Sequence, residues 1–126
     1  MPLHLTLRPG ERALVGGALV EADGPVRLRI SGDAPVLRAA EAVRPEDAST
    51  PATRILAAAQ GAAFDDAPER REAAARLCEQ FGEATTLEAI RAVATAAAAA
   101  ARAGDWTALL RQARLLLRHE QAVLPR

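Results

Sequence analysis

Apolar and polar side chains alternate along the first forty-five residues, with the period of two that is typical of strands with one buried face. Leucine occupies every second position in segment 3–7, and apolar residues occupy every second position in segment 26–30. Gly16-Gly17 separates two short apolar runs and predicts a two-residue hairpin, because glycine readily adopts the positive φ that such turns require. Further turns are expected at 23–25 and at 32–35. This part of the chain therefore predicts an antiparallel β-meander of four to five short strands.

After residue 45 the spacing of apolar residues becomes helical. Thr50 before Pro51 predicts the start of a first helix that ends near Phe64, since a hydroxyl residue caps a helix well and proline suits its first position. A second helix is expected to open at Asp66 and Pro68, and its end is expected at the glycine at position 82. Two helices are thus predicted before residue 83.

Two more helices are predicted in the C-terminal third of the chain. Thr85 and Glu88 have the spacing of a capping box for the third, which crosses an alanine run and stops at Gly104. Asp105 is expected to cap the fourth, which runs to about Leu124. Its broad apolar stripe predicts a packed face. That stripe comprises Trp106, Leu109, Leu110, Ala113, Leu116, Leu117 and Leu124.

These elements predict an α+β fold, in which a small N-terminal antiparallel β-meander of four to five strands is followed by a helical bundle of about four helices. The expected division is an antiparallel β sub-domain at 1–46 and a helical sub-domain at 47–126 that packs on it. Among the 126 residues, half are hydrophobic. Many of these are alanine, so the core is expected to be thin.

Composition and charge narrow the class of protein. The 16 basic residues balance the 16 acidic ones, and every basic residue is arginine. This balance argues against a strongly basic nucleic-acid binder, so any RNA contact has to come from a local patch. No uncharged stretch of the helical region is longer than Ala92–Ala101, which is about half of what a membrane span requires. The N-terminus lacks the pattern of a secretory signal, so a cytoplasmic protein without membrane contact is expected.

Residues able to carry out catalysis are few. Cys78 is the one cysteine and is expected to be a small buried apolar residue. His4 and His119 lie at opposite ends of the chain, and the Asp65-Asp66 pair is explained by capping between two helices. No metal-ligand spacing, nucleophile motif or phosphate loop is found. We therefore expect neither an enzyme nor a cofactor.

Two arginine arrays are candidates for binding phosphate. Arg8, Arg27 and Arg29 alternate with apolar residues and are expected on one sheet face. Arrays of this kind neutralise backbone phosphates of RNA. A second array, at helical spacing on the last helix, comprises Arg111, Arg114 and Arg118. An ordinary solvated face is the more common explanation of either array, and the aromatic residues that stack on single-stranded RNA are scarce.

The order of several segments resembles the FlbT family of flagellar biosynthesis regulators. The block from Thr50 to Ile55, with its Thr-Pro-Ala-x-Arg-Ile pattern, is the most telling of them. The resemblance spans nearly the whole chain. The other segments are Pro2–Arg12, Leu14–Val20, Val36–Arg38, Pro45–Ser49 and Gly104–Leu110, with Arg114–Leu116 and His119-Glu120.

This resemblance implies a cytoplasmic post-transcriptional regulator that binds the 5′-untranslated region of flagellin messenger RNA and promotes its degradation. It adds Arg12 and Arg54 to the candidate phosphate contacts. The implied partner is the flagellin mRNA leader, with flagellin, the small protein FlaF or a ribosome-associated complex as further candidates. The alternative is a protein-interaction adaptor without RNA affinity of its own, which docks through the amphipathic last helix and the arginines at 111, 114 and 118.

Overall fold

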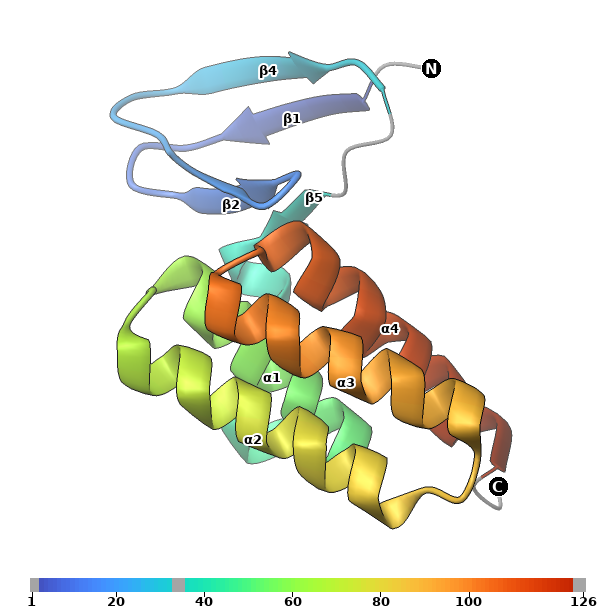
Figure 1. The fold of residues 1–126 in the computed structure, drawn as a ribbon. Coiled ribbons are helices and arrows are strands. Elements are labelled where there is room, and N and C mark those ends of the chain that lie inside the picture. The colour runs from blue at the N-terminus through green and yellow to red at the C-terminus, as the bar shows by residue number, and fades with distance from the viewer. Residues whose placement is uncertain (1–2, 33–35, 124–126) are drawn as a thin grey trace. The chain divides into compact units, whose positions relative to one another are not determined.

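A computed structural model describes residues 3–32 and 36–123, and the chain divides into two compact units, Met1–Ala42 and Val43–Arg126 (Figure 1). The first unit holds short antiparallel strands and the second holds four helices, which confirms the predicted α+β fold class. Residues 33–35 of the expected turn at 32–35 and the expected helix end at Leu124 lie outside the described residues.

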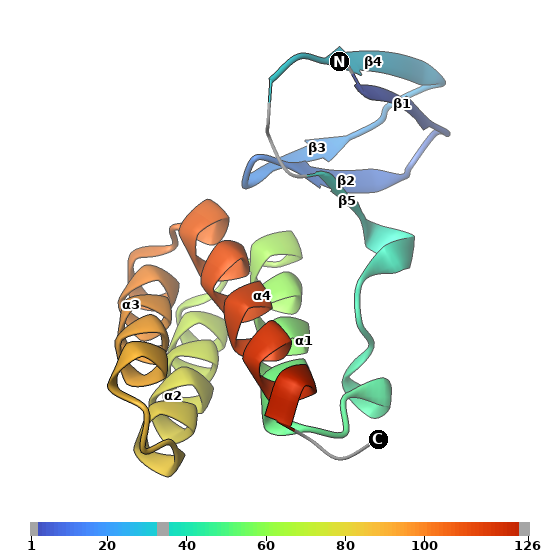
Figure 2. The ribbon, with the colours of Figure 1, turned by 90° about the vertical axis from the view of Figure 1, so that its right-hand side faces the viewer.

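Five strands form two small antiparallel sheets in the first unit (Figure 2). One sheet pairs β1 with β4, and the other has the order β3-β2-β5. Among the described strands, consecutive ones pair only in the β2–β3 hairpin, so the strand order differs from that of a simple meander. Gly16 and Gly17 have φ of 57° and 87°, which confirms the predicted two-residue turn. The strands are β1 (Leu3–Leu7), β2 (Arg12–Val15), β3 (Ala18–Glu21), β4 (Val26–Ile30) and β5 (Val36–Arg38).

The two sheets share one apolar core. Leu5 and Leu7 of β1 are almost fully buried, together with Ala13 of β2 and with Ala22 just after β3. Val26, Leu28 and Ile30 of β4, among other apolar residues, pack against this cluster. The alternation read from the sequence thus corresponds to a packed and an exposed face on β1 and β4, except that Leu3 at the start of β1 is exposed.

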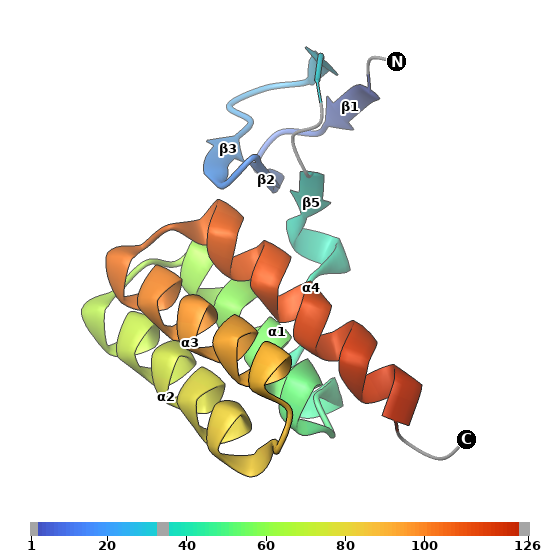
Figure 3. The ribbon, with the colours of Figure 1, turned by 45° about the vertical axis from the view of Figure 1, so that its right-hand side comes forward.

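Four helices make up most of the second unit (Figure 3). α2 packs on α1 and α3, and α4 packs on α3 and α1. Much of the buried surface is alanine, including five alanines of α3. Side chains this small allow close helix packing. The helices are α1 (Pro51–Phe64), α2 (Pro68–Ala84), α3 (Glu88–Ala103) and α4 (Trp106–Val123); two short 3₁₀ turns, η1 (Ala39–Glu41) and η2 (Pro45–Asp47), precede them.

Three of the predicted helix boundaries are confirmed with their capping chemistry. The Thr50 side chain accepts from the Thr53 backbone N–H at the start of α1. Gly104 has φ of 69° at the end of α3, the left-handed conformation that favours glycine. The Asp105 carboxylate accepts from the Ala108 backbone N–H, 3.2 Å away, at the start of α4.

The end of the second helix and the start of the third were predicted wrongly. α2 continues past Gly82 to Ala84, because Gly82 lies inside the helix where α3 approaches; a Cβ there would be 3.2 Å from the Ala94 Cβ. Thr85 is the C-terminal cap residue of α2, and its hydroxyl accepts only from the backbone N–H of Leu87. The expected capping box with Glu88 does not form, and Leu87 occupies the N-cap position of α3.

The expected capping role of the Asp65-Asp66 pair is confirmed only for Asp65, the C-cap residue of α1, whose backbone N–H donates to the Gly61 carbonyl at 2.9 Å. Asp66 does not cap α2. Ala67 is the N-cap residue of α2 and makes no side-chain cap bond. Both aspartates are instead paired with arginines in the first turn of that helix. Across the described residues, none of the helices combines the length and the apolarity that crossing a membrane requires.

Candidate functional site

Arg27 and Arg29 lie together on the exposed face of the β1–β4 sheet. The register places Arg27 opposite Thr6 and Arg29 opposite His4, and all four residues are exposed. Neither arginine side chain forms an ion pair or hydrogen bond within the described residues. This sheet face, defined by Arg27 and Arg29, therefore carries two positive charges that no described carboxylate neutralises.

The other two arginines selected in the first unit have different surroundings. Arg8 is exposed just beyond the end of β1, and its backbone N–H donates to the Glu11 carboxylate at 2.6 Å. Arg12 begins β2 and stands opposite Glu21 in the register. An acid directly across the ladder offsets the charge of Arg12. Arg12 therefore adds less positive charge to the unit than the residues at 27 and 29.

The second array lies along α4. Arg111, Arg114 and Arg118 fall within roughly 60° of helix circumference. This arc is opposite the packed face, which includes Leu109 and Leu116. None of the three arginines has an ion pair within the part of the chain that the structure describes. α4 contains a single acidic residue, and that residue is buried on the packed face. The arc is therefore a cationic row.

Four of the five arginines of α2 and α3, by contrast, pair with acids, whereas Arg91 donates to the backbone carbonyl of Thr85. Arg102 of α3 reaches Glu72 and Glu79 of α2, at 3.0 and 2.8 Å. The hydrogen bonds that the Arg102 guanidinium donates hold the pKa of both carboxyls below their usual value. Arg76 also lies within 3.4 Å of Glu72. These pairs tie α2 to α3 and leave little net charge on that side of the bundle.

Arg71 has a comparable structural role at the other end of α2. Its Nε donates to Asp66 at 2.7 Å, and this hydrogen bond lowers the pKa of the Asp66 carboxyl. The guanidinium also lies 5.6 Å from the centre of the Trp106 ring. Such a cation–π contact stabilises the pair. Arg71 thus joins the start of α2 to the start of α4.

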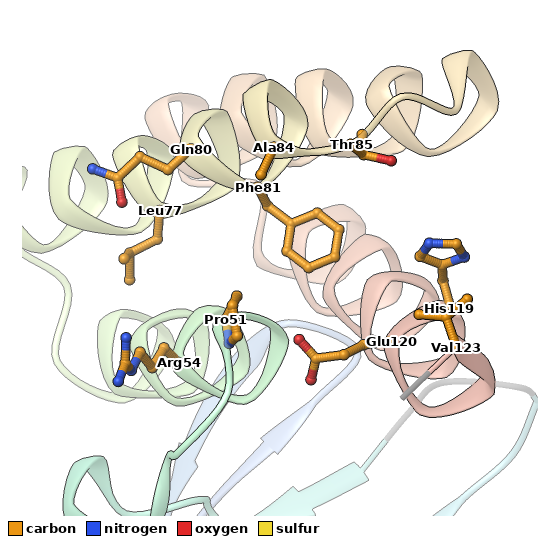
Figure 4. Close-up of a pocket in the computed structure, with 10 residues that line it drawn as sticks. All are labelled: Pro51, Arg54, Leu77, Gln80, Phe81, Ala84, Thr85, His119, Glu120 and Val123. Carbon is orange, nitrogen blue, oxygen red and sulfur yellow. The ribbon is translucent and has the colours of Figure 1, made fainter. Parts of the chain in front are cut away.

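Arg54 is the selected arginine that lies in a hollow. It lines a pocket of about 350 Å³, formed by the start of α1 and the ends of α2 and α4, whose walls include Leu77, Phe81 and Glu120 (Figure 4). In the close-up, Leu77 and Phe81 extend from α2 towards α1 and α4. A second hollow of about 370 Å³, walled largely by alanine and glycine of α1 and α2, shares Arg54 and Leu77. We call the two hollows together the α1–α2 groove.

The residues considered for catalysis, His4, Cys78 and His119, lie on three different elements, β1, α2 and α4. His4 is exposed on β1, and His119 is half-buried at the rim of the α1–α2 groove. Cys78 is fully buried in α2, and this burial raises the pKa of its thiol to about 11, so that it remains protonated and unreactive at neutral pH. Within 3–32 and 36–123, no group of three or more His, Cys, Asp or Glu side chains is placed to hold a metal ion.

Sequence reasoning missed the α1–α2 groove. Its walls combine Leu77 and Phe81 with small residues such as Ala58, Gly61 and Ala73. From the sequence, these small residues were assigned no part in a site. A signal was present, because alanine and glycine face one another across α1 and α2 and leave space that larger side chains would fill.

Fold and surfaces together describe a small α+β protein with an antiparallel β unit and a four-helix unit. The family described as "Flagellar protein FlbT" matches residues 3–124, and the chain belongs to this family. It is similar to proteins named "Probable flagellum biosynthesis repressor protein FlbT" from Brucella ovis, Brucella anthropi and Brucella melitensis. Each is 40% identical over 58 residues, which cover 46% of this chain and 38% of the relative. The match thus spans less than half of the curated relatives' length. No solved structure matches the chain.

Proposed function

We propose that this protein regulates flagellum biosynthesis by binding the leader of flagellin messenger RNA and promoting its degradation. Membership of the FlbT family supports the flagellar role, as does the name of the Brucella relatives. The observation that carries the RNA contact is the exposed pair Arg27 and Arg29, which no described carboxylate neutralises.

The placement of the arginines without a described acidic partner supports phosphate binding. Guanidinium groups bind phosphate oxygens as planar forks and stay charged at any physiological pH. Arg27 and Arg29 offer two such forks on adjacent exposed positions of one strand face. The cationic row of Arg111, Arg114 and Arg118 offers three more on α4. Arg8 supplements the first set, because it follows β1 directly and its side chain is exposed.

A gel-shift titration of a flagellin leader RNA at several salt concentrations tests this function. Each phosphate contact to a single strand contributes a slope of about −0.7 in log K against log salt. The double variant Arg27→Ala/Arg29→Ala should bind more weakly, with a slope about 1.4 less steep. Arg70→Ala/Arg76→Ala is the matched control, since it removes the same charge from arginines that are already ion-paired.

Equal binding by the wild type and both double variants would overturn direct RNA contact through the β1–β4 sheet. The alternative, an adaptor without RNA affinity, is separated by a pull-down from motile cells with and without ribonuclease. Partners that are lost on RNA digestion support RNA binding, and partners that are retained support the adaptor.

A further inference from the structure

We propose that the α1–α2 groove is a docking site for an amphipathic helix of a partner protein. Two apolar side chains of that helix fill the two hollows, and a carboxylate between them pairs with Arg54. This inference goes beyond RNA binding and does not depend on it, because the groove uses a different surface from Arg27 and Arg29.

The chemistry of the groove carries the proposal. One hollow has Leu77 and Phe81 on its walls, and the other is bounded mainly by alanine, glycine and proline. Arg54 belongs to both hollows and has no ion pair within the described residues. Apolar pockets around one positioned charge are typical of specific binding sites. An apolar partner surface with one acid is complementary to this arrangement.

Other charged groups of the groove leave Arg54 as the anchor for that acid. Glu120 lies on a wall of the first hollow, but one of its carboxylate oxygens is occupied by the Ala52 backbone N–H. Arg70 borders the second hollow and pairs with Asp65 at 3.3 Å. His119 stands at the rim of the first. A partner carboxylate is therefore repelled at Glu120 and attracted at Arg54.

Spacing along α2 defines the expected partner motif. Ala73 belongs to one hollow and Phe81 to the other, and eight residues of helix span about 12 Å. Two apolar residues at i and i+7 of a partner helix are about 10.5 Å apart, so they can fill both hollows. An aspartate or glutamate at i+3 or i+4 then lies between them, facing Arg54.

A displayed library of helical peptides, each of about 15 residues or roughly four turns, provides the probe. Selection on the full chain should enrich peptides with apolar residues at i and i+7 and an acid between them. Binding of the consensus peptide, measured by fluorescence anisotropy, should weaken at least tenfold in Arg54→Glu. A peptide with its acid changed to arginine should recover binding to that variant.

Two further variants separate the groove from general charge and folding effects. Arg111→Glu makes the same charge reversal on the cationic row and should leave peptide binding unchanged. Ala58→Trp fills the second hollow and should abolish binding, while circular dichroism verifies that the helices remain.

Three results would overturn the proposal. The first is that the selected peptides lack the acid, or that they bind the Arg54→Glu variant as tightly as they bind the wild type. The wild type could dimerise in sedimentation experiments while Ala58→Trp stays monomeric, which would make a second copy the occupant. Flagellin leader RNA could displace the peptide from the wild type and fail to bind Arg54→Glu, which would assign the groove to RNA.

Discussion

The Glu120 carboxylate accepts a hydrogen bond from the backbone N–H of Ala52, 2.9 Å away and 68 residues earlier in the chain. Ala52 is the second residue of α1, and its N–H has no partner within the helix. The next N–H, of Thr53, is satisfied by the Thr50 side chain. α4 therefore completes the cap of α1, and the positive end of the α1 dipole favours a carboxylate there.

Removing this carboxylate should destabilise the helical unit. Glu120 is 7% exposed and Ala52 is fully buried, so Glu120→Ala leaves the buried N–H of Ala52 without an acceptor. A hydrogen bond to a charged group contributes about 1.5–3 kcal/mol, and we expect a loss in this range from urea denaturation. Glu120→Gln keeps an acceptor and should lose less. The exposed neighbour Gln121→Ala is the control, and equal stability of all three variants would contradict the role of Glu120.

Thr50→Ala should cost about 1 kcal/mol, because it removes the hydroxyl that caps α1. Thr50 and Thr53 form a reciprocal box, in which each side chain accepts from the other's backbone N–H. Ser49→Ala, next to the cap in an exposed position, should have no comparable effect. Matching midpoints for Thr50→Ala and Ser49→Ala in chemical denaturation would mean that water replaces the hydroxyl without loss.

Local signals in the sequence were sufficient to predict a turn or a helix boundary where one residue type determines the backbone conformation. Thr50-Pro51, Gly16-Gly17 and Gly104 were all placed correctly, because the cap that Thr50 provides and the positive φ of these glycines depend on residues next to them in the chain. Gly82 was misread because its small size serves contact with Ala94, a residue on another helix. Such a requirement is visible only once the helices are packed.

The same limit applies to the candidate sites. Alternation placed Arg27 and Arg29 on an exposed face, and the predicted two-residue turn at Gly16-Gly17 is enough to set Arg12 opposite Glu21. Helical spacing likewise placed the cationic row on one side of α4. The α1–α2 groove arises from tertiary packing, and Arg54 came into consideration through the family resemblance alone.

Leu116 is, with Leu109, one of the two leucines of α4 that are fully buried, so its truncation should be costly. Leu116 is fully buried, whereas Leu117, which the apolar stripe had also suggested as a buried position, is only partly buried. Leu116→Ala should destabilise the protein by about 2–5 kcal/mol, because it leaves a cavity in a close-packed core. Leu117→Ala should cost less, and the exposed Leu115→Ala least. A reversed order in denaturation midpoints would mean that α4 is rotated about its axis.

Stability in acid should depend on Arg102. Its hydrogen bonds lower the pKa of Glu72 and Glu79 from the ordinary value of 4.5. A carboxyl with a lowered pKa in the folded state stabilises it fully above its unfolded pKa, and loses this effect as pH falls through the lowered value. The melting temperature of wild type should therefore fall below about pH 4.5 more steeply than that of Arg102→Met. Arg111→Met, which removes an unpaired arginine, should leave the acid profile unchanged; parallel profiles for wild type and Arg102→Met would contradict this prediction.

Gly104→Ala should destabilise the turn between α3 and α4 and alter the surroundings of the single tryptophan. A residue with a side chain at φ of 69° costs roughly 1–2 kcal/mol, and the added Cβ would lie 2.6 Å from the Arg71 Cζ. Arg71 would have to move away from Asp66 and from the Trp106 ring, which it now contacts. We therefore expect a lower midpoint of denaturation together with a shifted Trp106 emission, and Arg71→Ala should reproduce the emission shift. Gly24→Ala is the control, because its φ is not positive and nothing lies within 4 Å of the added atom. A Gly104→Ala variant with the emission and midpoint of Gly24→Ala would show that neither the left-handed conformation nor the Arg71 contact constrains this turn.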